Sequence, residues 1–261
     1  IKLLESKNRH KNDNRISFDE KEHNYFVDGQ QVGFSVTAII DKFFVEFDSG
    51  YWAKRKAMEK LTQDGVVIDK KALTKPIDEI LNKWEETRRD AAERGTCLHE
   101  KIEDFYNEKH YEEYPIEFSF FKKFHDKYPA LTPYRTEWRI FDASVSIAGT
   151  VDMVYKKNNG DVFIFDWKRS TKLVDQQGNV LLKDLKYGLE GLSHVEDNSF
   201  NRYALQQNIY KYILESNYGA KVSSMNLLVL HPDYKDFIHL PVPEMQKEAK
   251  YLIDQAKELS K

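Results

Sequence analysis

The chain has 261 residues, of which 41% are hydrophobic, 13% aromatic and 32% charged. This composition excludes a disordered chain and suits one large globular domain with its own core. The formal net charge of -3 excludes a uniformly basic nucleic-acid binder, although it says little about local clusters. We find no apolar run of membrane-spanning length, no secretory signal and only one cysteine, Cys97, and therefore expect an intracellular protein.

The first part of the chain is predicted to form a hairpin followed by helices. Apolar and polar residues roughly alternate over residues 16–36, on both sides of Asp28-Gly29, a dipeptide favoured in two-residue turns. Apolar residues at spacings of three and four then indicate helices, with Gly50, Gly65 and Pro76 as breaks. The helices are expected at residues 37–44, 51–61 and 77–106.

The remaining chain reads as strands with interspersed helices. Strands are expected at 134–141, 145–155 and 161–168, then at 222–231 and 237–240, with helices at 201–216 and 244–259. The segment DQQGN, residues 175–179, is predicted to be a loop tip or a small hairpin. The first three strands can form an antiparallel meander. The order predicts an α/β fold, in which helices flank a mixed central sheet and a hairpin and helical region precede it.

The predicted strand at 161–168 carries two charges in an apolar setting. It is apolar on both faces until its end, as in a central strand covered on both sides, and Asp166 and Lys168 close one face. Burying an unpaired charge there would be costly. A buried ion pair, or a strand that emerges into water, would explain these residues without a function. A functional site would explain them as well, because buried ion pairs often contribute little to stability.

A second carboxylate, Asp152, lies in the preceding apolar strand, close to Gly149, which permits close approach of a backbone or ligand. The loop over residues 156–160 is short enough for the two strands to be neighbours, which would bring Asp152 near Asp166. Two adjacent carboxylates repel each other unless a cation or proton joins them. Aspartate oxygens suit Mg²⁺ or Mn²⁺, and Lys168 could orient an attacking water or neutralise a developing charge.

Two further motifs lie on predicted helices. In RGTCLHEKIEDFY, His99 and Glu103 share a helix face, although a lone helical histidine is more often a surface or core residue. In RYALQQNIYKYIL, Gln206 and Tyr210 share a face, and ordinary packing of an amphipathic helix also explains that pattern.

Together these motifs resemble a known family. Asp152, a short loop and Asp166-Trp167-Lys168 resemble the motif of the PD-(D/E)XK nuclease superfamily, with Val151 in place of its nominal proline. The patterns GTxxHxxxE and QxxxY resemble those of its RecB-type branch, and HNYFVDG…FSVTAII resembles the beginning of RecB-type exonucleases of viruses, phages and mitochondria. The resemblance implies one nuclease domain, residues 1–261, with a hairpin and helical subregion at 1–87 and a restriction-endonuclease-like catalytic core at 88–261.

The resemblance also implies a metal site and catalytic residues. One divalent cation, Mg²⁺ or Mn²⁺, would be held by His99, Asp152, Asp166 and the backbone carbonyl of Trp167. Lys168 would position or help activate the water. Glu137 is a further acidic candidate, for which an exposed strand face is the alternative. The predicted catalytic set comprises Asp152, Asp166, Lys168, Glu137, Gln206 and Tyr210.

Substrate contacts are expected from cations and aromatic rings outside the metal ligands, namely Arg55, Arg169, Lys172, Lys186 and Tyr203. We expect a metal-dependent deoxyribonuclease, an exonuclease acting on single-stranded DNA or DNA ends in replication, repair or recombination. An endonuclease, an RNA nuclease of the same fold and a non-catalytic nucleic-acid-binding module are the alternatives. An unrelated α/β domain with a chance match would place His99 and Asp166 far apart.

Overall fold

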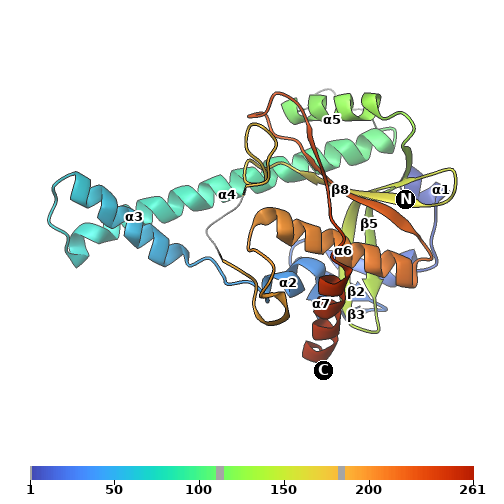
Figure 1. Ribbon diagram of the computed structural model, residues 1–261, viewed down its shortest axis with the longest axis horizontal. Helices are drawn as coiled ribbons and strands as arrows, with labels where there is room; N and C mark the ends of the chain where they lie inside the picture. The colour runs from blue at the N-terminus through green and yellow to red at the C-terminus, as the bar shows by residue number, and fades with distance from the viewer. Residues whose placement is uncertain (1, 110–114, 182–185) are drawn as a thin grey trace. The chain divides into compact units, whose positions relative to one another are not determined.

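The computed structural model describes residues 2–109, 115–181 and 186–261 (Figure 1). The chain forms two compact units, a larger one made of residues 1–45 with 98–261, and a smaller one made of residues 46–97. The predicted subdivision of the nuclease domain at residues 87 and 88 stays a prediction. No helix in the described part of the chain is long and apolar enough to cross a membrane.

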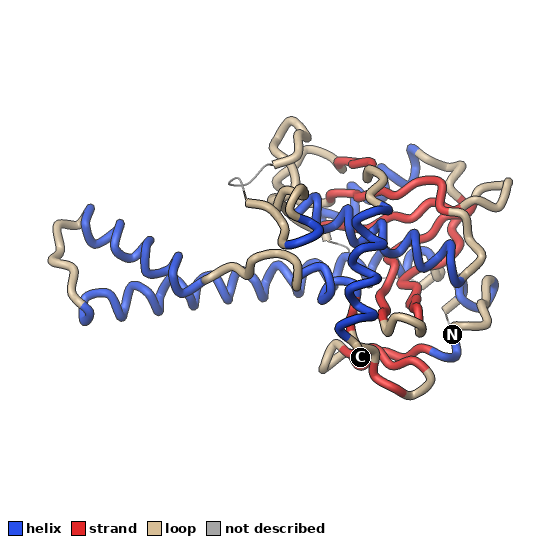
Figure 2. Tube along the Cα trace, turned by 60° about the horizontal axis from the view of Figure 1, so that its bottom comes forward, coloured by secondary structure: helices blue, strands red, loops and turns tan. Residues whose placement is uncertain are grey.

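The larger unit is built on a six-stranded sheet (Figure 2). Its strands are β4 (Phe34–Ser35), β5 (Thr132–Asp142), β6 (Ile147–Lys156), β7 (Val162–Lys168), β8 (Val222–Val229) and β9 (Ile238–Pro241). Strands β5, β6 and β7 form the predicted antiparallel meander. Strand β8 then pairs parallel to β7, β9 pairs antiparallel to β8, and β4 pairs parallel to β6. The sheet is therefore mixed, which confirms the predicted fold class.

Helices cover both faces of this sheet. Helices α2 (Val36–Asp41), α6 (Ser199–Asn217) and α7 (Gln246–Leu259) contribute to one hydrophobic cluster, which we call the α6-side cluster. The residues of helix α4 (Lys70–Tyr106) from Leu98 onward, with α5 (Ile116–Lys127), contribute to another, the α5-side cluster.

The residues of β7 divide between these two clusters as the alternation predicted. Ile164 belongs to the α6-side cluster, whereas Phe165 and Trp167 belong to the α5-side cluster. Burying a side chain of this size contributes about 1.5–3 kcal/mol. The alternating apolar residues of β7 therefore hold the two helical layers on opposite faces of one strand.

The predicted N-terminal hairpin is right at its turn and wrong in its long first arm. Strands β1 (Ile16–Asp19), β2 (Asn24–Val27) and β3 (Gln30–Gln31) form a small antiparallel sheet. Asp28 and Gly29, at φ 51° and 80°, form the expected turn between β2 and β3. A second turn, with His23 at φ 52°, divides the first arm because the polar run over residues 20–23 offers no apolar side chain to pack.

The smaller unit contains helix α3 (Ser49–Gln63) and the first part of α4. The break predicted at Pro76 is wrong, since α4 begins at Lys70 and contains Pro76. The Asp69 side chain accepts a hydrogen bond from the Ala72 amide at 2.7 Å, which satisfies a free donor of the first turn and starts the helix earlier. The remaining short elements are α1 (Leu3–Lys7) and the 3₁₀ turns η1 (Asp13–Arg15) and η2 (Glu190–Leu192).

Candidate active site

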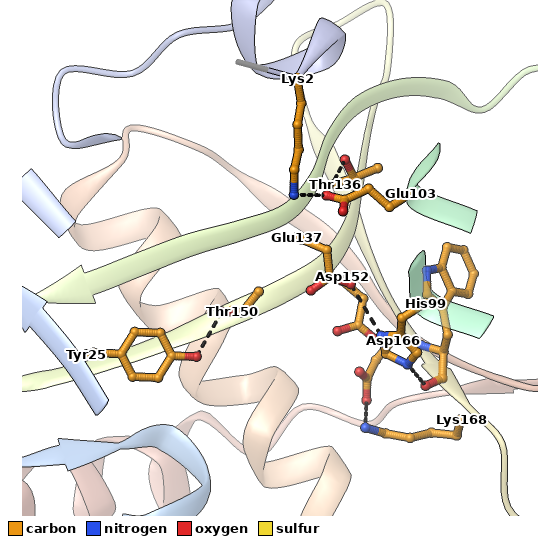
Figure 3. Close-up of polar contacts among 11 residues, drawn as sticks. Lys2, Tyr25, His99, Glu103, Thr136, Glu137, Thr150, Asp152, Asp166 and Lys168 are labelled. Atoms are coloured by element: carbon orange, nitrogen blue, oxygen red, sulfur yellow. Dashed lines mark hydrogen bonds and ion pairs between the residues drawn. The ribbon is translucent and has the colours of Figure 1, made fainter. Parts of the chain in front are cut away.

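The candidate site lies where β6 and β7 diverge (Figure 3). Their last paired residues toward this end are Met153 and Phe165, so Asp152 and Asp166 are the next residue on each strand. The Trp167 amide donates a hydrogen bond to Asp152 Oδ2 at 2.9 Å. The Asp152 carboxylate thus accepts a hydrogen bond from a backbone amide of β7 beyond the point where the pairing of β6 with β7 ends. The divergence of the strands brings two acidic side chains to the same point of the sheet.

His99, near the C-terminal end of α4, reaches this point from another element. Its Nε2 lies 2.9 Å from the carbonyl oxygen of Trp167, and its Nδ1 lies 3.3 Å from Glu137 Oε1. The same Nδ1 is 3.6 Å from Asp152 Oδ2. His99, Glu137 and Asp152 each offer a ligand atom within 4.8 Å of the others, an arrangement that could hold a metal ion. His99 and Asp152, two of the predicted ligands, therefore lie together with Glu137, whereas Asp166 is not part of this group of three.

Glu137 reaches the site through an unusual backbone conformation. It lies on β5 between the pairs Thr136–Met153 and Trp138–Val151, and is therefore opposite Asp152. Its φ of 42° is in the left-handed region, which is costly for a residue with a side chain, and such strain inside a strand recurs at functional sites. Its side chain is 27% exposed and contacts His99, so it does not occupy an open strand face.

Asp166 and Lys168 form a buried ion pair at 2.6 Å, with side chains 3% and 16% exposed. Burial and the neighbouring Asp152 carboxylate raise the pKa of Asp166 well above its ordinary value, although Lys168 opposes this shift. Burial opposes the ammonium form of Lys168, but the Asp166 carboxylate outweighs it and raises the pKa of Lys168. Asp166 Oδ2 is buried and has no aligned hydrogen-bond partner among the described residues.

The potential at the site favours a cation. Burial opposes protonation of His99, yet the Asp152 and Glu137 carboxylates outweigh burial and raise its pKa to about 10. Carboxylate oxygens, an imidazole and a backbone carbonyl are ligands that hard divalent cations accept. Asp166 Oδ2, which faces the Lys168 ammonium at 2.6 Å without an aligned hydrogen bond among the described residues, is a further oxygen that a cation could share. The residues present therefore fit a divalent metal ion.

Gln206 and Tyr210 lie on α6 beside the same strands. Gln206 Nε2 donates to the Tyr210 hydroxyl at 3.0 Å, whereas the buried Gln206 Oε1 has no partner among the described residues. A Cβ atom on Gly149 would lie 2.7 Å from Tyr210 Cε1, so the glycine admits this ring against β6. Burial raises the pKa of Tyr210 well above its ordinary value, and the nearby Tyr25, Asp166 and Asp152 add to this. Tyr210 also belongs to the α6-side cluster, so it is both a packing residue of the core and a neighbour of the site.

The predicted substrate contacts lie in several places. Arg55 belongs to the smaller unit, where it pairs with Glu59 at 3.2 Å. Arg169 directly follows β7, and its side chain is buried and paired with Glu117. Lys172 and Lys186 are exposed. The Lys168 ammonium lies over the Tyr203 ring, 4.1 Å from its centroid. Contacts of these residues with nucleic acid stay predictions.

Two features near the site lay outside the sequence predictions. Glu117 belongs to α5, where no helix was predicted, although the spacing of Phe118, Phe121 and Phe124 is typical of a buried helix face. Glu103 shares a face with His99 as expected, but it pairs with Lys2 instead of joining the group of metal ligands.

The mixed sheet with helices on both faces, and acidic residues and a lysine where two strands diverge, define a restriction-endonuclease-like nuclease fold. A family model described as the PD-(D/E)XK nuclease superfamily matches residues 56–261, and the chain belongs to this superfamily. No curated protein matches the chain.

Two solved structures are similar over most of the chain. One is "Crystal structure of SSO0001", with 11% identity and a TM-score of 0.32, covering 87% of this chain and 76% of that one. The other is described as a "Putative exonuclease" from Eubacterium rectale, with 11% identity and a TM-score of 0.31, covering 84% of this chain and 70% of that one. At these TM-scores neither likeness supports an argument about this chain.

Proposed function

We propose that the protein is a RecB-type, metal-dependent deoxyribonuclease that acts inside the cell as an exonuclease on single-stranded DNA or DNA ends. Membership of the superfamily supports hydrolysis of a nucleic acid. The observation that carries the finer proposal is the position of His99, which contacts Glu137, Asp152 and the Trp167 carbonyl at once. A histidine beside the acidic residues is the feature expected of the RecB-type branch, and Asp152 is one of those residues. Exonucleases of that branch are expected to act in DNA replication, repair and recombination.

The metal ligands in this proposal are His99, Asp152, Asp166 and the carbonyl oxygen of Trp167, with Glu137 close enough to take part. Mg²⁺ is the expected ion and Mn²⁺ the expected substitute, because the donor set is rich in oxygen. When bound, such an ion lowers the pKa of a water ligand and stabilises negative charge that grows on the scissile phosphate.

The protein's own groups hold and orient the reacting atoms. The Trp167 amide fixes Asp152 through its hydrogen bond, and the Asp166 carboxylate fixes the Lys168 ammonium. The protonated Lys168 can donate hydrogen bonds to an attacking water or to a phosphate oxygen, and its charge opposes the charge developing on that phosphate. Its side chain is 16% exposed, so the ammonium is shielded from bulk water.

Digestion of end-labelled substrates tests the proposal. Wild-type protein with Mg²⁺ or Mn²⁺ is expected to shorten single-stranded DNA or DNA ends progressively, while EDTA stops the reaction. Asp166→Ala and Lys168→Ala are expected to lower the rate by at least about a hundredfold. Asp126→Asn removes an exposed carboxylate of α5 and is the matched control, expected to cleave like the wild type.

Each contrary result removes a defined part of the proposal. Full activity of both site variants would remove the site, and cleavage in EDTA would remove the metal. Internal cuts in circular DNA would indicate an endonuclease, and cleavage of RNA alone would exclude the deoxyribonuclease. Binding of DNA without cleavage under any of these conditions would indicate a non-catalytic module.

A further inference from the structure

We propose that Tyr203 is a positioning residue, whose ring face holds the Lys168 ammonium where the reaction needs it. This inference rests on the proposed function, in which Lys168 acts on the attacking water or the phosphate. It assigns Tyr203 a task inside the site, instead of the contact with substrate bases that its sequence position suggested.

The geometry around the ammonium carries the inference. Lys168 Nζ lies 2.6 Å from Asp166 Oδ2 and 4.1 Å from the centroid of the Tyr203 ring. The face of an aromatic ring carries partial negative charge and attracts a cation at this distance, most strongly where water is excluded. Lysine has a flexible four-carbon stem, so one carboxylate leaves it many conformations. The Tyr203 ring gives the ammonium a second contact and so restricts its position.

Contacts of helix α6 hold the Tyr203 ring in place beside Lys168. Tyr203 lies in the first turns of α6, whose N-cap Asn198 accepts a hydrogen bond from the Asn201 amide at 2.8 Å. Arg202 ties the same turn to Asp197 at 2.8 Å and to Asp41 of α2 at 2.9 Å. Tyr203 itself is half-buried and packs against the α6-side cluster. A ring held in this way can act as a fixed support for a mobile side chain.

Stacking on a base would require a different use of the same ring. A base stacks on the face of an aromatic side chain, and the Tyr203 face toward Lys168 is already occupied by the ammonium. The two roles differ in what they affect: a stacking residue contributes to substrate binding, whereas a positioning residue contributes to the chemical step after binding.

Kinetics of ring-removing and ring-keeping variants separate these roles. Tyr203→Leu is expected to lower kcat by about tenfold while KM stays within about twofold. Tyr203→Phe keeps the ring and is expected to recover kcat to within about threefold of the wild type. Tyr212→Leu, which takes a half-buried tyrosine from α6 at a position with no contact to Lys168 in the described structure, is the matched control for packing loss.

A measurement on the metal-free protein keeps the inference testable even if cleavage is not observed. The ε-methylene protons of Lys168, assigned by comparison with Lys168→Arg, are expected to show an upfield ring-current shift in the NMR spectrum. The shift should persist in Tyr203→Phe and in Tyr212→Leu and disappear in Tyr203→Leu. Its absence from the wild type would overturn the inference, whatever becomes of the proposed nuclease activity.

Binding of a single-stranded oligonucleotide, measured by fluorescence anisotropy, completes the test. Tyr203→Leu is expected to leave the dissociation constant within about twofold, both in the wild-type background and in Lys168→Ala. Equal weakening in both backgrounds would assign the ring to base stacking. Equal loss of kcat in Tyr203→Phe and Tyr203→Leu would assign the effect to the hydroxyl, and equal loss in Tyr212→Leu would assign it to packing of α6.

Discussion

At the scale of single residues, Glu137 shows how a site position conflicts with local preference. Its φ of 42° is unfavourable for glutamate, and asparagine tolerates this region better. We therefore expect Glu137→Asn to unfold with a free energy about 0.5–1 kcal/mol higher than Glu137→Gln, since both lose the charge but only one suits the backbone. Urea unfolding of the two variants measures this difference.

Both Glu137 variants should lower the cleavage rate by at least about tenfold, because the carboxylate that contacts His99 is gone. Equal stability of Asn and Gln at this position would show that the backbone is not strained. Unchanged cleavage would exclude Glu137 from the reaction.

Asp13 is the opposite case, a half-buried charge with no place in the proposed chemistry. Its carboxylate accepts hydrogen bonds from Arg135 at 2.8 Å, from the Trp138 indole at 3.0 Å and from the His10 amide at 2.8 Å. Burial opposes its charged form, but these donors outweigh burial and lower the pKa of Asp13. A lowered pKa means that the carboxylate stabilises the fold above its unfolded pKa of about 4, and that this contribution is lost as the pH falls through the folded value.

Replacing Asp13 should therefore have a cost that depends on pH. Asp13→Asn is expected to lose about 2–3 kcal/mol of unfolding free energy at pH 7, because the buried Arg135 guanidinium loses its charged partner. The gap from the wild type should narrow below about pH 4. Chemical denaturation at several pH values measures it, with Asp28→Asn as the control because the Asp28–Arg15 pair is exposed. A gap that does not change with pH would refute the assigned role of this carboxylate.

At the scale of elements, the site depends on a short stretch of β6 that pairs with β5 along one edge, while neither β4 nor β7 pairs with its other edge. Strand β4 pairs with β6 at Ile147 and Ala148, and β7 pairs with it from Met153 onward. Between them, Gly149 lets Tyr210 approach the backbone. The helix α6 is thereby seated directly against the part of β6 that carries Asp152.

Gly149→Ala should disturb the packing of α6 against β6. The new Cβ atom would lie 2.7 Å from Tyr210 Cε1 and 3.0 Å from Val36 Cγ2, so we expect a loss of about 1–3 kcal/mol in unfolding free energy and slower cleavage. Gly95→Ala is the matched control, since nothing lies within 4 Å of a Cβ atom there. In helix α4 that change should stabilise the protein by about 0.5–1 kcal/mol. Equal effects of the two substitutions on unfolding would contradict the packing described for Gly149.

Periodicity predicted the elements whose two faces are unambiguous. Strand β7 has apolar residues on both faces, and its prediction at 161–168 differs from the observed strand by one residue at the start. Helix α5 was missed because Phe120 adds an apolar residue outside the regular spacing, although the spacing of Phe118, Phe121 and Phe124 was available. Proline at position 76 suggested a break that the Asp69 cap overrode. Local preference fails where a cap or packing partner from elsewhere decides the boundary.

The candidate site was predictable as a set of residues but not as an arrangement. Asp152, Asp166 and Lys168 could be identified from the sequence as charged residues in apolar strands. Burying an unpaired charge is costly, so their presence there indicates a function or a partner. The contact of Glu137 with His99 needs a left-handed backbone that alternation along a strand does not predict. The ring of Tyr203 over Lys168 depends on how α6 packs, which spacing alone does not give.

At the scale of the whole molecule, the site joins parts of the chain that are distant in sequence. Its proposed ligands come from α4, β5, β6 and β7, all in the larger unit. A cation bound by groups from several elements is bound only while those elements are folded together. Metal binding should therefore stabilise the whole unit against unfolding. Replacing a single ligand should remove this entire stabilisation.

Thermal unfolding with and without metal tests this coupling. A ligand at 100 times its dissociation constant adds about 2.7 kcal/mol, which corresponds to a rise of roughly 5–10 °C in Tm for a protein of this size. We expect the rise in wild type with Mg²⁺ or Mn²⁺ and its reversal by EDTA. Asp152→Asn should lose it, because this carboxylate contacts His99 and the Trp167 amide, whereas Asp126→Asn should keep it. The same rise in Asp152→Asn would place the bound ion elsewhere, and no rise in wild type with either ion would contradict a metal site built from these elements.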